Sequence, residues 1–131
     1  MFFYLRILFF IFLSCSYLIT GYSQSNFFTH DFGKTQEGKV LKHRFIYKNK
    51  TAKILTITGV NTSCGCTTSK VEKKKLSPKE KTSIETKFDT KGYSGPTEQH
   101  VYLHTDDPGN QIITFMLKTN VIAARMPSKK N

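Results

Sequence analysis

The sequence lacks tryptophan, has only three cysteines and is poor in acidic residues, with nine against 20 lysines and arginines. A hydrolase needs a nucleophile, a base and an orienting acid that converge, and no supporting motif frames Ser63 or Cys64 in this way. The few acidic residues fall mainly in expected turns or on exposed strand faces. The sequence therefore predicts that the protein is not an enzyme.

The formal net charge is +11, yet the features that accompany nucleic-acid binding are missing. There is no arginine-rich face, no glycine-rich RNA motif and no helix-turn-helix pattern, so we expect no nucleic-acid partner. The lysines are spread along the chain except for one cluster, Lys70, Lys73, Lys74 and Lys75. This cluster is a candidate patch for an anionic partner such as a glycan or a membrane surface, although a soluble surface also explains it.

Long apolar runs are absent except at the N-terminus, where Arg6 precedes an apolar core over residues 7–13. This layout predicts a signal peptide at residues 1–23, cleaved after Ser23. The core is shorter than the ~18 residues that favour a spanning anchor. Cys15 offers the alternative of a lipidated lipoprotein cysteine. In each case we expect export to the periplasm or cell envelope, where a disulfide can persist.

No window of the remaining chain shows a capped segment with helical periodicity. Strand-like patterns of alternating or β-branched residues instead cover residues 27–32, 40–49, 53–60, 83–89, 99–105 and 111–122. With the turn signals between them, the count reaches about seven short antiparallel strands. The prediction is an all-β, immunoglobulin-like β-sandwich over residues 24–124, followed by a disordered basic tail at 125–131.

Turn chemistry predicts how neighbouring strands connect. The polar segment 49–52 is short enough to join 40–49 and 53–60 as a hairpin, and 106–110, with Asp, Pro and Gly, suits a second hairpin. Along 40–49 the alternation places Phe45 and Tyr47 on the inner face. Two glycosylation sequons, at Asn49 and Asn61, are most simply chance matches.

The stretch TSCGCTT places Cys64 and Cys66 one glycine apart, and three kinds of chemistry remain open for them. A disulfide would close a very small, strained ring, and strained disulfides tend to be labile or functional. A thiolate pair would suit a soft metal ion, copper or zinc. In the third alternative, the cysteines are small apolar residues where a strand leaves the sheet.

A metal site would need further ligands, and the histidines supply few. His100 and His104 lie about 13 Å apart along one strand at ~3.3 Å per residue, too far to share one ion. At most one of them could join the cysteines.

The chain resembles the bacterial DUF1573 family over roughly residues 27–122. The residues that carry the resemblance are Asp31-Phe32-Gly33, Glu37-Gly38, the strand 43–49, Leu55-Thr56-Ile57, the signature Ser63-Cys64-Gly65-Cys66-Thr67, the turn 76–80, and the ending 88–90 with Gly92-Tyr93-Ser94-Gly95. Lys79 departs from the pattern, because a glycine is common there. The resemblance implies an exported immunoglobulin-like sandwich, related in architecture to major-sperm-protein, PapD-like and ASPM–SPD-2–Hydin domains, with no established enzyme activity.

These observations together predict an exported, non-enzymatic binding or scaffold module. Its expected partner is another envelope protein, bound at a sheet edge or by loops at one end of the sandwich. The alternative is a small thiol-redox or soft-metal protein centred on Cys64 and Cys66.

Overall fold

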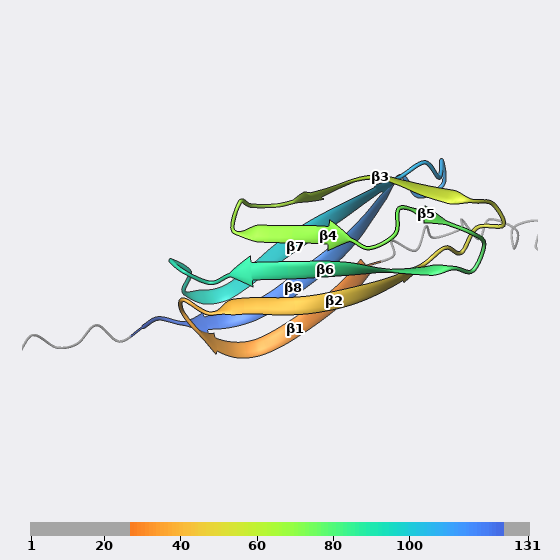
Figure 1. Cartoon of the computed structure of the whole chain (residues 1–131). Helices are drawn as coiled ribbons and strands as arrows, with labels where there is room; N and C mark the ends of the chain where they lie inside the picture. Colours follow the sequence, from red (N-terminus) through yellow and green to blue (C-terminus); the bar gives the residue numbers. More distant parts are fainter. Residues whose placement is uncertain (1–26, 125–131) are drawn as a thin grey trace, which may run out of the picture.

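The computed structural model describes residues 27–124, which form eight strands and no helix (Figure 1). The strands are β1 (Phe27–Gln36), β2 (Val40–Lys48), β3 (Leu55–Thr62), β4 (Thr67–Val71), β5 (Lys75–Leu76), β6 (Lys81–Asp89), β7 (Gly95–Thr105) and β8 (Ile112–Ile122). The predicted signal peptide, Cys15 and the predicted tail lie outside the described residues. Within them, no helix has the length and hydropathy needed to span a membrane.

The strands form two sheets that pack face to face. One has five strands in the order β1-β8-β7-β3-β5, and the other has three in the order β2-β6-β4. The predicted all-β sandwich is thus confirmed, but it differs from about seven antiparallel strands in two respects. The short β4 and β5 were not recognised, because five and two residues give too little periodicity. In addition, β1 pairs with β8 in parallel.

The predicted hairpin between 40–49 and 53–60 is wrong. β2 pairs with β6 and β3 pairs with β7, so the connection crosses from one sheet to the other. The cause is Asn49, which is fully buried and donates its Nδ2 hydrogens to the carbonyl oxygens of Lys53, Leu76 and Ser77 at 2.8–3.1 Å. By contrast, β7 and β8 form the expected antiparallel hairpin, closed by 106–110.

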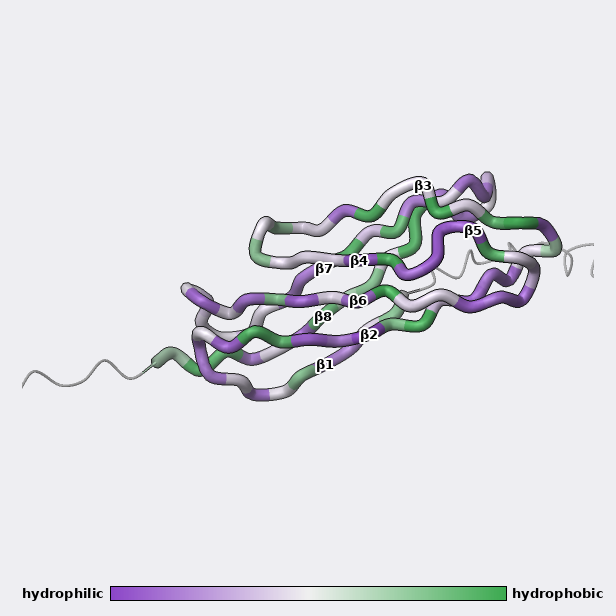
Figure 2. Tube along the Cα trace, in the orientation of Figure 1, coloured by the Kyte–Doolittle hydropathy of each residue, from purple (hydrophilic) through white to green (hydrophobic). Residues whose placement is uncertain are grey.

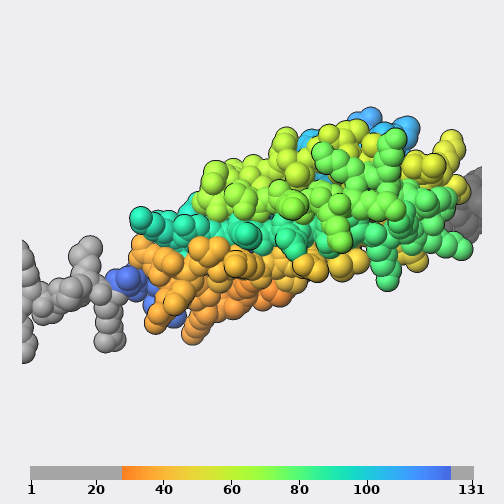
Figure 3. Space-filling view, in the orientation of Figure 1, coloured from red at the N-terminus to blue at the C-terminus, as the bar shows by residue number. Residues whose placement is uncertain are grey.

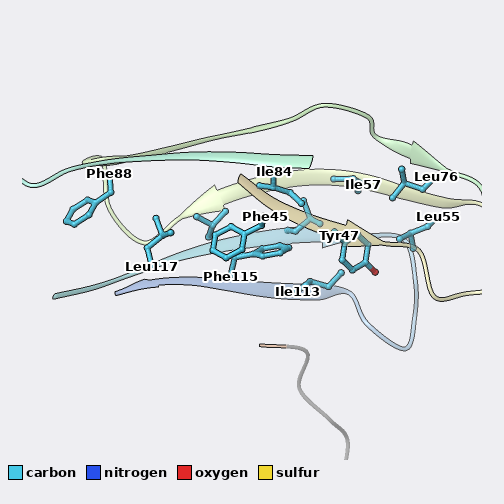
Figure 4. Packing of buried hydrophobic residues seen from close by; sticks show 12 residues of the cluster. Phe45, Tyr47, Leu55, Ile57, Leu76, Ile84, Phe88, Ile113, Phe115 and Leu117 are labelled. Atoms are coloured by element: carbon cyan, nitrogen blue, oxygen red, sulfur yellow. The ribbon is translucent and has the colours of Figure 1, made fainter. Parts of the chain in front are cut away.

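The core lies between the sheets, and along the strands its buried residues recur with a period of two. Figure 2 shows hydrophobic and hydrophilic residues following one another along the strands. Along β2, Phe45 and Tyr47 are buried while Arg44 and Ile46 are exposed, as predicted. Figure 4 shows Phe45 and Phe115, which come from opposite sheets, side by side in the core. Their ring centroids are 5.0 Å apart. Burying such a side chain stabilises the fold by about 1.5–3 kcal/mol. The rigid core positions the turns at both ends of the sandwich.

Candidate functional site

The turn between β3 and β4 carries the two cysteines, and Ser63 fixes it to the five-stranded sheet. The Ser63 amide donates to the carbonyl oxygen of His100 at 2.9 Å, and the Ser63 hydroxyl donates to Oε1 of buried Gln99 at 2.9 Å. The hydroxyl oxygen also accepts from the His100 amide at 2.9 Å. Ser63 therefore holds the backbone of the turn, which gives the serine of the signature a structural role.

Cys64 and Cys66 are joined by a disulfide, with their Cα atoms 5.3 Å apart. Both are partly exposed, and Cys66 packs against the hydrophobic core. The amide of Asp89 donates to the Cys66 carbonyl at 3.0 Å, which ties the turn to the three-stranded sheet as well. Gly65 does not adopt a positive φ, and a Cβ atom there would meet no atom within 4 Å. The turn therefore does not depend on the conformational freedom of that glycine.

Two hydroxyl groups lie next to the sulfur atoms. The Oη atom of Tyr93 is 2.9 Å from Sγ of Cys66, and Oγ1 of Thr67 is 3.5 Å from Sγ of Cys64 and 3.9 Å from Sγ of Cys66. Tyr93 was missed as a site residue, because 27 positions separate it from Cys66. The available signal was its place in the Gly-Tyr-Ser-Gly part of the family resemblance.

Tyr93 is held by the turn that follows β6. Its amide donates to the Thr90 carbonyl at 3.1 Å, and its ring meets that of Phe88 edge to face with centroids 5.2 Å apart. Gly92 takes a φ of +79°, which a glycine adopts without strain. Two turns distant in sequence thus converge at one end of the sandwich.

The metal alternative requires a different state of the pair. A soft metal ion binds thiolates, so both sulfurs would first have to be released from the disulfide. Among residues 27–124, no group of three or more His, Cys, Asp or Glu side chains is placed to hold an ion. Metal binding at Cys64 and Cys66 therefore stays a prediction for the reduced protein.

The structure does not bring the four lysines of the predicted anionic patch to one face. Lys70 lies on β4 opposite Glu85, Lys73 forms an ion pair with Glu80, and Lys75 belongs to the other sheet. Lys74 lies between them, with its carbonyl accepting from the Ile57 amide.

The clearer cationic feature is the outer face of the three-stranded sheet, which we call the cationic face. Figure 3, coloured by position in the sequence, is viewed from the side on which β2, β6 and β4 lie. Its cations lie on β2, β4 and β6: Lys42, Arg44, Lys48, Lys70, Lys81 and Lys87. Lys42 stands directly opposite Lys87, and Lys48 opposite Lys81. Like charges in this position destabilise a sheet.

One side of the sandwich is open between β3 and β4. The bonds from Asp89 N to Cys66 O and from Glu72 N to Ser83 O set the antiparallel alternation of β4. By that alternation, the backbone groups of Ser69 and Val71 point away from β6. The same reasoning, from the Ser63–His100 bond, points those of Val60 and Thr62 away from β7. A shallow groove of about 570 Å³ lies between the two edges, lined by Val60, Asn61, Thr62, Thr67, Thr68 and Ser69.

A sequence model of a family described as "Protein of unknown function (DUF1573)" matches residues 24–121. No curated protein matches the chain. A solved protein of unknown function from Porphyromonas gingivalis W83 is similar, with a TM-score of 0.62 and 16% identity. The match covers 80% of this chain and 51% of that one, so this chain spans about half of its length.

Two further solved structures share the fold. The ASH / PapD-like domain 7 of human CEP192 has a TM-score of 0.56 and 10% identity, covering 82% of this chain and 93% of that chain. The VesB protease of Vibrio cholerae has a TM-score of 0.62 and 20% identity, covering 71% and 30%. At these identities the similarity shows the fold alone.

Proposed function

Since the chain belongs to the DUF1573 family, which is described as of unknown function, we propose that it is an exported, non-enzymatic binding module. It works in the bacterial periplasm or cell envelope. Its partner is an extended segment of another envelope protein, which pairs with the free edge of β4. The single observation that carries this proposal is the open side between β3 and β4.

The four sheet edges differ in how well they are protected against strand pairing. β1 has an irregularity between Asp31 and Lys34, and β5 is two residues long. β2 carries Lys42, Arg44 and Lys48 along its outer face. Bulges, short length and charges are the devices by which proteins protect edges. β4 is short as well, but along Thr67, Thr68 and Ser69 it carries only small hydroxyl side chains.

The groove beside β4 suits a polypeptide backbone. Small side chains let a strand approach closely, and the outward backbone groups of Ser69 and Val71 supply donors and acceptors.

The test uses a photo-crosslinking residue at Thr68, which is exposed on β4, in the protein's own host. Its control is the same residue at Asn120, exposed on β8. We expect a specific covalent adduct from Thr68 that is absent from Asn120. Ser69→Pro removes an outward amide and should abolish the adduct, since the β6 ladder does not use that amide. Lys42→Pro, which removes an outward amide of β2, should retain it.

Adducts of equal strength from Thr68 and Asn120, or an adduct that survives Ser69→Pro, would contradict docking at β4. An adduct with a second copy of this chain would replace the proposed partner by self-association. The adduct should persist when Cys64 and Cys66 are both replaced by serine, whereas a thiol or metal protein would lose its activity. Export is checked by the intact mass of the protein from the envelope fraction, which we expect to correspond to a mature chain that begins at Gln24.

The opposed lysine pairs support a second candidate contact, with an acidic glycan. The pairs Lys42–Lys87 and Lys48–Lys81 place like charges together on the cationic face, where an anion would relieve their repulsion. We propose that a heparin column, used as a probe, retains the protein and releases it at moderate salt, because the shorter Debye length screens the attraction between the lysines and heparin. Lys42→Glu should elute earlier than Lys79→Glu, which changes an exposed lysine in the turn before β6.

A further inference from the structure

We propose that Cys64 and Cys66 form a dithiol–disulfide centre that reacts with thiols, and that the Tyr93 hydroxyl stabilises the sulfur that leaves. This inference goes beyond the proposed binding function and rests on different atoms. If it fails, docking at the β4 edge is unaffected, and the reverse is also true.

The two sulfurs have unequal surroundings. Cys66 packs against the hydrophobic core and lies 2.9 Å from Tyr93 Oη, whereas the nearest hydroxyl to the Cys64 sulfur is Thr67 Oγ1 at 3.5 Å. A hydroxyl that donates to a thiolate forms a charge-assisted hydrogen bond, roughly twice as strong as a neutral one. A disulfide sulfur is only a weak acceptor. The Tyr93 contact therefore favours Cys66 as a thiolate over Cys66 in the disulfide.

The hydroxyl donor is held in place before any reaction. Tyr93 is fixed by its contact with the buried ring of Phe88 and by its bond to the Thr90 carbonyl. The Thr90 hydroxyl, in turn, donates to the Lys39 carbonyl at 2.8 Å and accepts from the Lys39 amide at 2.9 Å. A group that is already positioned where charge develops lowers the barrier without a reorganisation cost.

The reaction is an ordinary thiol–disulfide exchange with a dithiol as reductant. A thiolate of the dithiol attacks Sγ of Cys64, which lacks the core contact of Cys66. A mixed disulfide forms, the Cys64–Cys66 bond breaks, and its electron pair passes to Sγ of Cys66, which accepts the hydrogen bond from Tyr93. The second thiolate of the dithiol then attacks the sulfur of the mixed disulfide that belongs to the dithiol, and Cys64 leaves as a thiolate. The protein gains two electrons and the dithiol becomes a cyclic disulfide.

The turn is built to keep the two thiols together after reduction. Ser63 ties it to His100, and the Cys66 carbonyl ties it to Asp89, so both ends stay attached to different sheets. None of these bonds involves a sulfur atom. Because the two thiols remain close, an external disulfide that oxidises one of them leads to re-formation of the Cys64–Cys66 bond.

The test measures the rate at which dithiothreitol reduces the native protein, with acid quenching and mass determination of alkylated cysteines. Tyr93→Phe keeps the ring against Phe88 but removes the hydroxyl. We expect its second-order rate constant to fall about tenfold, since a hydrogen bond to a charged group is lost. Tyr102→Phe is the control, because Tyr102 lies on the outer face of the other sheet, against His100. It should react at the wild-type rate.

A second readout separates thiolate stabilisation from a packing role. In Cys64→Ser, the remaining thiol of Cys66 is alkylated by iodoacetamide across a range of pH. Adding Tyr93→Phe should move the midpoint of this profile to higher pH, whereas a packing role of Tyr93 would leave it unchanged. An unshifted midpoint, a wild-type reduction rate in Tyr93→Phe, or a native disulfide that dithiothreitol reduces only on unfolding would each overturn the proposal.

Discussion

The imidazole rings of His30 and His43 stack in parallel, with centroids 3.6 Å apart and planes inclined by 11°, although β1 and β2 belong to different sheets. The rings of Phe32 and Phe45 meet this pair edge to face and help to close that side of the sandwich. Two imidazolium ions so close together would repel. A positive charge on His30 therefore opposes the protonation of His43.

The stability of the protein should consequently depend on pH near neutrality. The pKa of His43 is lowered from its ordinary value of 6.5, first by burial and then by the charge of His30. Because the pKa of His43 is lower in the folded state than in the unfolded state, the unfolded chain binds more protons as the pH falls. The contribution of neutral His43 to the free energy of unfolding is therefore fully present above pH 6.5 and is lost as the pH falls through the folded-state pKa. We expect the free energy of unfolding to decrease between about pH 7.5 and about pH 5.5.

The check is denaturant unfolding at these two pH values, compared with His43→Gln. The variant should be less stable at the higher pH but show a smaller decrease. His100→Gln, outside this stack, should keep the wild-type decrease. The pKa values of Glu80, Glu98 and Asp106 are lowered by hydrogen bonds and ion pairs, so their contributions are lost only at more acid pH. An equal decrease in His43→Gln would show that the stack is not responsible.

A second prediction concerns Asn49, which joins the crossover between the sheets to the segment before β6. Its side chain donates to three carbonyl oxygens and accepts from the amide and hydroxyl of Thr51 at 2.9 and 2.8 Å. Asn49→Ala removes all of these hydrogen bonds at a fully buried position, and we expect it to lower the free energy of unfolding by about 3 kcal/mol. Asn61→Ala, at the exposed asparagine of the other sequon, should cost less than about 0.5 kcal/mol. A loss at Asn49 as small as at Asn61 would refute the role assigned to it.

The same residue shows what the sequence can and cannot predict. The inner face of β2 could be identified because Phe45 and Tyr47 alternate with charged neighbours, and a period of two is a local signal. The crossover at Asn49 could not, because its partners Leu76 and Ser77 lie 27 and 28 positions away. A short polar segment between two strands is typical of a hairpin. Here, the hydrogen bonds of Asn49 to these distant carbonyls hold the segment as a crossover from one sheet to the other.

The candidate site follows the same division. The pair Cys64 and Cys66 is visible as a motif, whereas Tyr93 comes from another turn and carries no local pattern that points to sulfur. Likewise, the lysine run at 70–75 attracts attention in the sequence, but the strands distribute it over two sheets. The opposed lysines of β2 and β6 become neighbours only through strand register.

A third prediction uses the one residue other than glycine with a positive φ among residues 27–124. Lys79 has a φ of +67° in the turn 77–80, where the Glu80 amide donates to the Ser77 carbonyl at 3.0 Å. Proline followed by a residue with positive φ is typical of a type II turn, which favours glycine at the second of its two central residues, here Lys79. We expect Lys79→Gly to raise the free energy of unfolding by about 0.5–1 kcal/mol, because relief of backbone strain exceeds the added freedom of the unfolded chain.

The measurement is urea unfolding at high salt, where the repulsion between Lys48 and Lys81 is screened, with Lys81→Gly as the matched control. Lys81 lies in regular β6, where glycine gains nothing from a positive φ and weakens the strand. It should therefore lose about 0.5–1 kcal/mol. If both glycine variants lose stability alike, the strain assigned to Lys79 does not exist.

The final prediction concerns the like charges on the cationic face. Lys87 of β6 stands opposite Lys42 of β2, with Thr68 of β4 on its other side. Lys87→Glu converts the repulsive pair into an attractive one, and we expect the free energy of unfolding to rise by about 0.3–0.5 kcal/mol at low salt. The gain should shrink as salt is added, because both side chains are exposed and are screened.

Glu85→Lys provides the reverse experiment on the same strand. Glu85 lies opposite Arg44 on one side and Lys70 on the other, so its replacement creates a row of three cations. Stability should fall at low salt and recover as the salt concentration rises. If Lys87→Glu also weakens retention on heparin, then lysines that lower the stability of the sheet are the ones that bind the anion. A stabilised Lys87→Glu variant with unchanged retention would instead assign the opposed lysines to surface charge alone, without a glycan contact.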